Sequence, residues 1–174
     1  MALRETWRVM AWKSEDVYFV DIESTQTAAT EEPLKVLEYH YGGFGWRGPS
    51  EWLLPQASRG ATGCEFLTSE GHDRLKGNHS RPQWVSVTGP LSGELCTVAI
   101  FGHPTNLRHP QPVRLHPDKP YFCFAPCVLG EFAITRDQPL TSRYRIITHD
   151  GPARRDLYDQ CVQDWAASPE VHSR

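Results

Sequence analysis

The chain has 174 residues and a formal net charge of −3, because 18 Lys and Arg stand against 21 Asp and Glu. This length fits one domain with a core of its own. A charge so close to zero gives no general attraction to nucleic acid or to anionic membranes. The 11% of aromatic residues and 22% of charged residues exclude a disordered chain, and no apolar run is long enough to predict a membrane span.

The first residues lack the apolar region of a secretory signal, so the chain as written is expected to be cytoplasmic. Its five cysteines cannot all pair, and no CxxC motif occurs. Buried reduced thiols are therefore expected in preference to disulfides or metal ligands. A reducing compartment agrees with that interpretation.

Short runs in which apolar and polar residues alternate follow one another along the chain, separated by some of the 13 Gly and 14 Pro. This pattern is typical of an all-β protein. The predicted strands are 6–12, 17–27, 34–41, 84–88, 95–101, 121–125, 132–134 and 141–148. Residues 89–93 contain the turn signals of a hairpin between two of them.

One segment departs from the alternating pattern. Leu157, Cys161 and Trp165 recur every four residues, which predicts an amphipathic helix over about 152–166. We therefore expect a single all-β domain over residues 1–174 with a C-terminal amphipathic helix packed on a sheet.

Six prolines fall within residues 104–126. Proline cannot donate a hydrogen bond to a neighbouring strand, so most of this tract is predicted to be extended loop. A long loop of fixed shape inside a compact domain is a good place to search for function.

The glycine-rich segment 41–48 does not end in the GK[ST] of a phosphate-binding loop. Its residues Phe44, Trp46 and Arg47, together with Trp84, suggest the wall of a binding site. The apolar C–H faces of a sugar stack on aromatic rings, and an arginine fixes its hydroxyls. The alternative is that these rings are ordinary core residues, with the glycines allowing close backbone approach.

Polar residues cluster where the strand 95–101 is predicted to end: His103, Asn106, Arg108 and His109. Such positions often carry binding groups, and the planar fork of arginine suits a carboxylate or a pair of hydroxyls. The alternative is that these side chains satisfy the backbone of the proline-rich loop. No spacing typical of a metal site occurs, so no metal and no cofactor are expected.

Glu70 and His72 form a second polar pair, which could act as acid and base on a substrate. A solvated loop is the alternative. With His103, these two residues are the candidate catalytic groups, and they would exchange protons with a sugar hydroxyl or ring oxygen. No basic stripe with interleaved aromatics is present, so no nucleic acid partner is expected.

Three segments carry a resemblance to a known family: 41–48, 101–112 and 120–126, extended by Tyr144-Arg145 and Asp150-Gly151. Across nearly its whole length the chain resembles the soluble bacterial family labelled "methane oxygenase PmoA", a domain of unknown function. That resemblance implies a fold like galactose mutarotase, a large antiparallel β-supersandwich. It also implies a small-molecule carbohydrate as ligand. The membrane-spanning subunit of the same name is excluded because this chain has no span.

Members of that family are longer, with further strands and a His- and Trp-rich segment before the strand that here begins near Thr6. The resemblance thus implies that the domain is truncated at its N-terminal end, with an export signal possible on the missing part. Strands without partners expose edges that favour association of identical chains, so a homo-oligomer is a further expectation.

The leading expectation for function is carbohydrate binding or processing, of the mutarotase or epimerase kind. A non-catalytic interaction or structural module is the first alternative, in which the aromatic residues form the core. A metal-dependent oxidoreductase, as the family label suggests, is the second.

Overall fold

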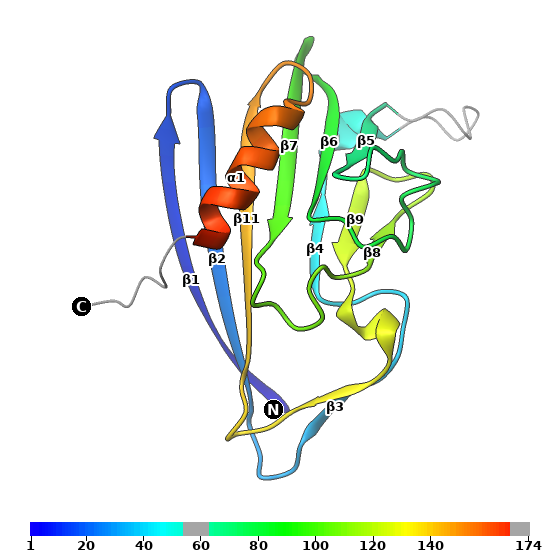
Figure 1. Cartoon of the computed structure of the whole chain (residues 1–174). Helices are drawn as coiled ribbons and strands as arrows, with labels where there is room; N and C mark the ends of the chain where they lie inside the picture. Colours follow the sequence, from blue (N-terminus) through cyan, green and yellow to red (C-terminus); the bar gives the residue numbers. More distant parts are fainter. Residues whose placement is uncertain (54–62, 168–174) are drawn as a thin grey trace.

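The protein is described here by a computed structural model, which describes residues 1–53 and 63–167. Its largest element is an antiparallel six-stranded sheet (Figure 1). The strand order is β1 (Leu3–Ser14), β2 (Val17–Ala28), β11 (Leu140–Asp150), β7 (Glu94–Gly102), β6 (Trp84–Leu91) and β5 (Glu65–Thr68). The all-β fold class with one C-terminal helix is thereby confirmed.

A single helix, α1 (Arg155–Ala167), covers one face of this sheet (Figure 1). The buried residues of the helix are Tyr158, Cys161 and Trp165. They pack on an apolar patch of the sheet made of Val17, Trp84, Ala99, Phe101 and Ile147. The helix begins three residues later than the sequence pattern predicts, but its apolar stripe is as expected.

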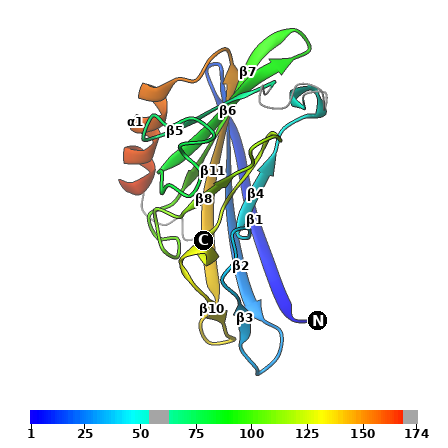
Figure 2. The same ribbon diagram turned by 90° about the vertical axis from the view of Figure 1, so that its right-hand side faces the viewer.

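The opposite face of the sheet packs on a second, three-stranded sheet, so that α1 and β4 lie on opposite sides of the large sheet (Figure 2). The strand order of the small sheet is β4 (Phe44–Arg47), β9 (Tyr121–Phe124) and β8 (Val113–Leu115). Between the two sheets lies the main core, which includes Trp52, Val85, Ile100, Phe122 and Tyr144. The arrangement is a β-sandwich with a helix as a third layer.

Smaller elements complete the chain. A two-stranded sheet joins β3 (Leu34–Val36) to β10 (Phe132–Ile134). The described residues also include the short 3-10 helices η1 (Ser50–Trp52) and η3 (Pro126–Leu129). The strand expected over 34–41 therefore stops at Val36. The tract 104–126 is not only loop, since it contains the whole of β8 and of β9. All five cysteines are reduced thiols, and every one but Cys96 is buried.

Candidate functional site

Three of the aromatic residues proposed from sequence lie in the core. Phe44 and Trp46 are on the inner face of β4, where Phe44 stacks on Tyr144 with 4.3 Å between ring centroids. Trp84 is fully buried beneath α1, and its Nε1 donates a hydrogen bond to Asp159 Oδ1 at 2.8 Å. Trp84 is therefore out of reach of a ligand on the surface, whereas Phe44 and Trp46 are partly buried.

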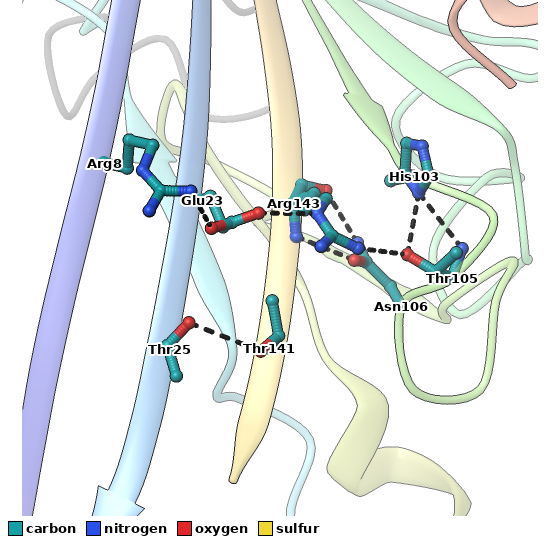
Figure 3. A network of polar contacts seen from close by, with 8 residues as sticks. All are labelled: Arg8, Glu23, Thr25, His103, Thr105, Asn106, Thr141 and Arg143. Carbon is teal, nitrogen blue, oxygen red and sulfur yellow. Dashed lines mark hydrogen bonds and ion pairs between the residues drawn. The ribbon is translucent and has the colours of Figure 1, made fainter. Parts of the chain in front are cut away.

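The loop after β7 is pinned to β11 by a polar network that includes two of the predicted residues (Figure 3). Asn106 Nδ2 donates to the backbone oxygen of Arg143 at 2.8 Å, and its Oδ1 accepts from the Arg143 N–H at 2.7 Å. His103 Nδ1 lies 2.8 Å from the Thr105 hydroxyl, which also accepts a bond from the Arg143 guanidinium. The Asn106 side chain thus bonds both backbone groups of Arg143, as a residue of a neighbouring strand would. These bonds hold the loop that carries His103 against the sheet.

The network continues from β11 across β2 to β1. Arg143 Nε donates to Glu23 Oε2 at 2.7 Å, and Arg8 pairs with the other oxygen of that carboxylate at 3.1 Å. Next to it, Arg145 makes two bonds to Asp21 and stacks on two indole rings. Each carboxylate is matched to at least one guanidinium, so this face is a balanced set of ion pairs.

Two further predicted residues, Arg108 and His109, lie in the proline-rich loop and contact the protein itself. The Arg108 guanidinium donates to the backbone oxygens of Pro126, the first residue of η3, and of Gly130 and Glu131, which follow η3. His109 is half-buried, and burial lowers the pKa of its imidazole, with His103 and Arg81 adding to the effect. At neutral pH His109 is therefore an uncharged ring packed within the loop.

The candidate acid and base remain close together. Glu70 Oε2 lies 3.4 Å from His72 Nδ1, just beyond the end of β5, and the backbone N–H of His72 donates to the Thr68 hydroxyl. His103 follows β7, two strands away in the sheet order. The structure thus brings Glu70 to His72, while His103 belongs to the network on β11.

Arg47 alone of the seven predicted binding residues is an exposed side chain beside partly buried aromatic rings. Residues alternate along β4, so Arg47 faces outward while Trp46 faces the core. Its guanidinium lies 5.4 Å from the centroid of Tyr121, the residue opposite it on β9. Arg114 on β8 lies at 5.4 Å from Tyr41 in the same way.

The rings on this outer face form a continuous series. Tyr39 and His40 are 4.3 Å apart between centroids, His40 and Tyr41 are 4.5 Å apart, and Tyr41 lies 6.1 Å from Tyr121. We call this group the tyrosine surface, and define it as Arg47, Tyr39, His40, Tyr41, Arg114 and Tyr121. Tyr39 is 58% exposed, so much of its ring is open to solvent.

Glycines explain how the segment before β4 reaches this position. Gly42 and Gly43 both have positive φ angles, of 132° and 71°, which side-chain-bearing residues rarely adopt. A Cβ on Gly43 would lie 2.2 Å from the backbone oxygen of Phe124. The two glycines therefore let the chain pass close to the end of β9 and the start of η3, and Tyr41 lies near Tyr121 and Arg114 on the outer face of the small sheet.

A hollow of about 290 Å³ lies at the edge of the tyrosine surface, lined by Glu38, Tyr39, His40 and Val128. The hollow is shallow and largely open to solvent, and its volume lies just below the range for enclosed ligand pockets, which begins at about 300 Å³. The lining combines aromatic rings, a carboxylate and an apolar side chain. It can stack the apolar face of a small polar ligand and hydrogen bond to its rim.

Sequence reasoning misses most of this surface. Tyr121 falls in a predicted strand, and alternation puts it on the face opposite Phe122, but nothing in the sequence pairs that strand with Arg47. Arg114 lies in the proline-rich tract, where the sequence predicts no strand. Tyr39 and His40 fall within a predicted strand that in the structure ends earlier. The only local pattern that indicates this surface is the run of three consecutive rings, Tyr39-His40-Tyr41.

Within the part of the chain that the structure describes, no helix is long and apolar enough to cross a membrane. Among the same residues, no three His, Cys, Asp or Glu side chains gather where they could hold a metal ion.

Comparison with known proteins places the chain in a family. The model of a family of unknown function (DUF6807) matches residues 1–163, so the chain belongs to that family. No curated protein and no solved structure matches the chain. The match agrees with the expected domain of unknown function, and nothing in it supports the methane-oxygenase label.

Proposed function

Since the family to which the chain belongs has no assigned function, we propose one from its surface: the chain binds a small carbohydrate in the hollow at the edge of the tyrosine surface. The observation that carries this proposal is the hollow of about 290 Å³, where the half-exposed Tyr39 ring lies beside Glu38 and His40. Sugars present both apolar C–H faces and hydroxyl edges, and this lining offers partners for both.

Charge at the tyrosine surface adds to the argument. Arg47 and Arg114 lie over the rings of Tyr121 and Tyr41, which keeps two guanidinium groups close to a row of aromatics. Planar guanidinium groups donate paired hydrogen bonds to vicinal hydroxyls and to carboxylates. A sugar seated in the hollow and extending along the rings would meet these donors, so acidic sugars belong among the ligands to be tested.

Processing of the sugar is a separate proposal. Glu70 Oε2 and His72 Nδ1 lie 3.4 Å apart without a hydrogen bond between them, so the pair would have to close on a substrate to act as acid and base. Both residues lie beyond the end of β5, outside the tyrosine surface as defined. Epimerase-like chemistry would therefore need its own binding position there. Polarimetry of a freshly dissolved sugar tests it: the proposed activity speeds the change of rotation, and Glu70→Gln abolishes that effect.

Calorimetric titration of the whole chain tests binding, with D-glucose, D-galactose, D-mannose and D-glucuronate as probes. Tyr39→Ala should weaken binding about 5- to 150-fold, which corresponds to the range of about 1–3 kcal/mol for stacking on an aromatic ring. Tyr18→Ala is the matched control, because Tyr18 is also about half exposed (51%) but lies on β2. Equal affinities for the Tyr39 variant and the wild type would rule the hollow out.

A further inference from the structure

The outermost strand of the large sheet is unusually open. β1 has twelve residues and, among the described strands, pairs only with β2. Trp7 and Val9 are 57% and 56% exposed on one face of the strand, and Met10 is 50% exposed on the other. An edge of this length with apolar side chains is a template for another strand. The other edge strand, β5, has only four residues.

The sequence of β1 is complementary to itself when two copies run antiparallel. Backbone N–H and C=O groups point outward at every second residue. In a pairing of two identical strands about a twofold axis, outward-pointing residues must therefore face one another. If Val9 lies on that axis, Trp7 faces Ala11 and Glu5 faces Lys13 of the second copy. A large ring then lies against a small residue, and opposite charges meet at both ends.

The neighbouring registers lack this match. Moving the axis to Arg8 places two arginines opposite each other, and like charges at this distance are unfavourable. Moving it to Trp7 places Glu5 opposite Val9, and moving it to Met10 places Lys13 opposite Trp7. Both also shorten the ladder. Among these alternatives, only the register centred on Val9 pairs the charges of β1.

The charged side chains already lie on the required face. Glu5 accepts hydrogen bonds from the Ser24 hydroxyl at 2.6 Å and from the Gln26 amide at 2.9 Å. These bonds, that of Ser24 first, lower the pKa of Glu5 and keep it negative. The Lys13 Nζ lies 4.9 Å from the centroid of the Tyr18 ring. Glu5 and Lys13 therefore lie on one face of β1, and their present contacts are with β2, so pairing with a second copy would have to compete with these contacts.

We propose that the chain forms a homodimer in which β1 pairs antiparallel with β1 of a second copy, in the register centred on Val9. The two large sheets then continue into one another, and the exposed Trp7 and Val9 become part of a shared apolar strip. The partner is a second copy because the strand's own charge pattern complements itself.

Sedimentation of the full chain with charge-reversal variants tests this proposal. Glu5→Lys and Lys13→Glu should each weaken dimerisation by roughly tenfold or more, since each turns two attractive pairs into repulsive ones. The double variant should regain the dimer. An equimolar mixture of the two single variants should form a heterodimer, because position 5 of one copy and position 13 of the other then again carry opposite charges. Glu94→Lys, in the hairpin between β6 and β7, is the control with the same change of charge.

Cross-linking fixes the register. A cysteine at position 9 faces its own copy across the axis, at a spacing that a disulfide spans. Ala11→Cys is the matched control on the same face, because its own copy lies four residues away, about 13 Å along the strand. Val9→Cys should form a covalent dimer under mild oxidation and Ala11→Cys should not. A monomeric wild type, or a dimer that none of these substitutions affects, would overturn the proposal.

Discussion

Arg108 illustrates how the fold employs a side chain that sequence reasoning assigns to a ligand. Its guanidinium donates to three backbone oxygens around η3, while its own backbone has a φ of 63°. One side chain thus bonds to the backbone of three residues in this segment. The alternative interpretation of the proline-rich loop, in which its polar side chains satisfy backbone groups, describes both Arg108 and Asn106.

Arg108→Lys should therefore lower the free energy of unfolding by about 1–3 kcal/mol, because a point charge replaces a fork that reaches three acceptors. Lysine keeps the charge and the same backbone preference, so any loss of stability measures the contribution of the hydrogen bonds from the guanidinium. Urea unfolding measures it. Arg8→Lys, at a side chain that is 63% exposed, is the control and should change stability very little. Equal losses in the two variants would contradict this role.

His109 predicts a dependence of stability on pH. Burial lowers the pKa of its imidazole in the folded state, so the unfolded chain takes up this proton first as pH falls below about 6.5. The stability gained from the neutral ring is complete above that pH and is lost as pH falls through the lower, folded pKa. Burial lowers the pKa of His116 in the same direction.

His109→Phe removes one of these groups and keeps a ring of similar shape. Its free energy of unfolding should fall less between pH 7 and pH 5 than that of the wild type. Urea unfolding at the two pH values provides the comparison. A loss of the same size in both proteins would show that the His109 proton does not contribute.

At the scale of elements, α1 depends on one buried polar contact. The Tyr158 hydroxyl lies 2.6 Å from His149 Nε2 on β11, and both side chains are buried. His149 Nδ1 is 2.9 Å from the backbone oxygen of Asp150, so both ring nitrogens have partners. Burial raises the pKa of Tyr158 to about 12, which keeps its hydroxyl protonated.

Tyr158→Phe should cost about 1–3 kcal/mol, because a buried imidazole nitrogen loses its partner. The raised pKa adds a second signature. The unfolded chain releases this proton near pH 10, so the stabilisation by neutral Tyr158 is complete below pH 10 and is lost as pH rises toward 12. Unfolding followed at pH 8 and pH 11 should show a smaller loss in the Phe variant than in the wild type. An equal fall in the free energy of unfolding of both proteins between pH 8 and pH 11 would contradict the role given to the Tyr158 hydroxyl.

The helix and the long strands can be predicted from sequence because their patterns are regular. Leu157, Cys161 and Trp165 mark the helix, and alternation in β2 places Ile22 and Glu23 on opposite faces. The glycines among aromatic residues in 41–48 suggest a strand or a bulge, and β4 lies there. The short strands β5 and β8 escape prediction, because Glu65–Thr68 has four residues and Val113–Leu115 has three, and neither is long enough to display a period. Their strand structure comes from pairing with distant segments.

At the scale of the whole molecule, the layers decide which residues can meet a ligand. Aromatic side chains look alike in sequence, but Trp84 lies between helix and sheet, Phe44 lies between the two sheets, and Tyr39 lies outside both. No local pattern separates these three positions, because each depends on contacts between segments far apart in the chain. The carbohydrate proposed as ligand is therefore assigned to exposed rings such as Tyr39, and not to the aromatic residues chosen from the sequence.

The most direct test of the central claim is an NMR titration of the isotope-labelled chain with the same four sugars. Binding in the hollow predicts saturable shifts of the backbone amide signals of residues 38–41, with smaller shifts at Tyr121 and Val128, and the loss of these shifts in Tyr39→Ala. Shifts confined to the network around Arg143, or no shifts at millimolar sugar, would contradict carbohydrate binding at the tyrosine surface.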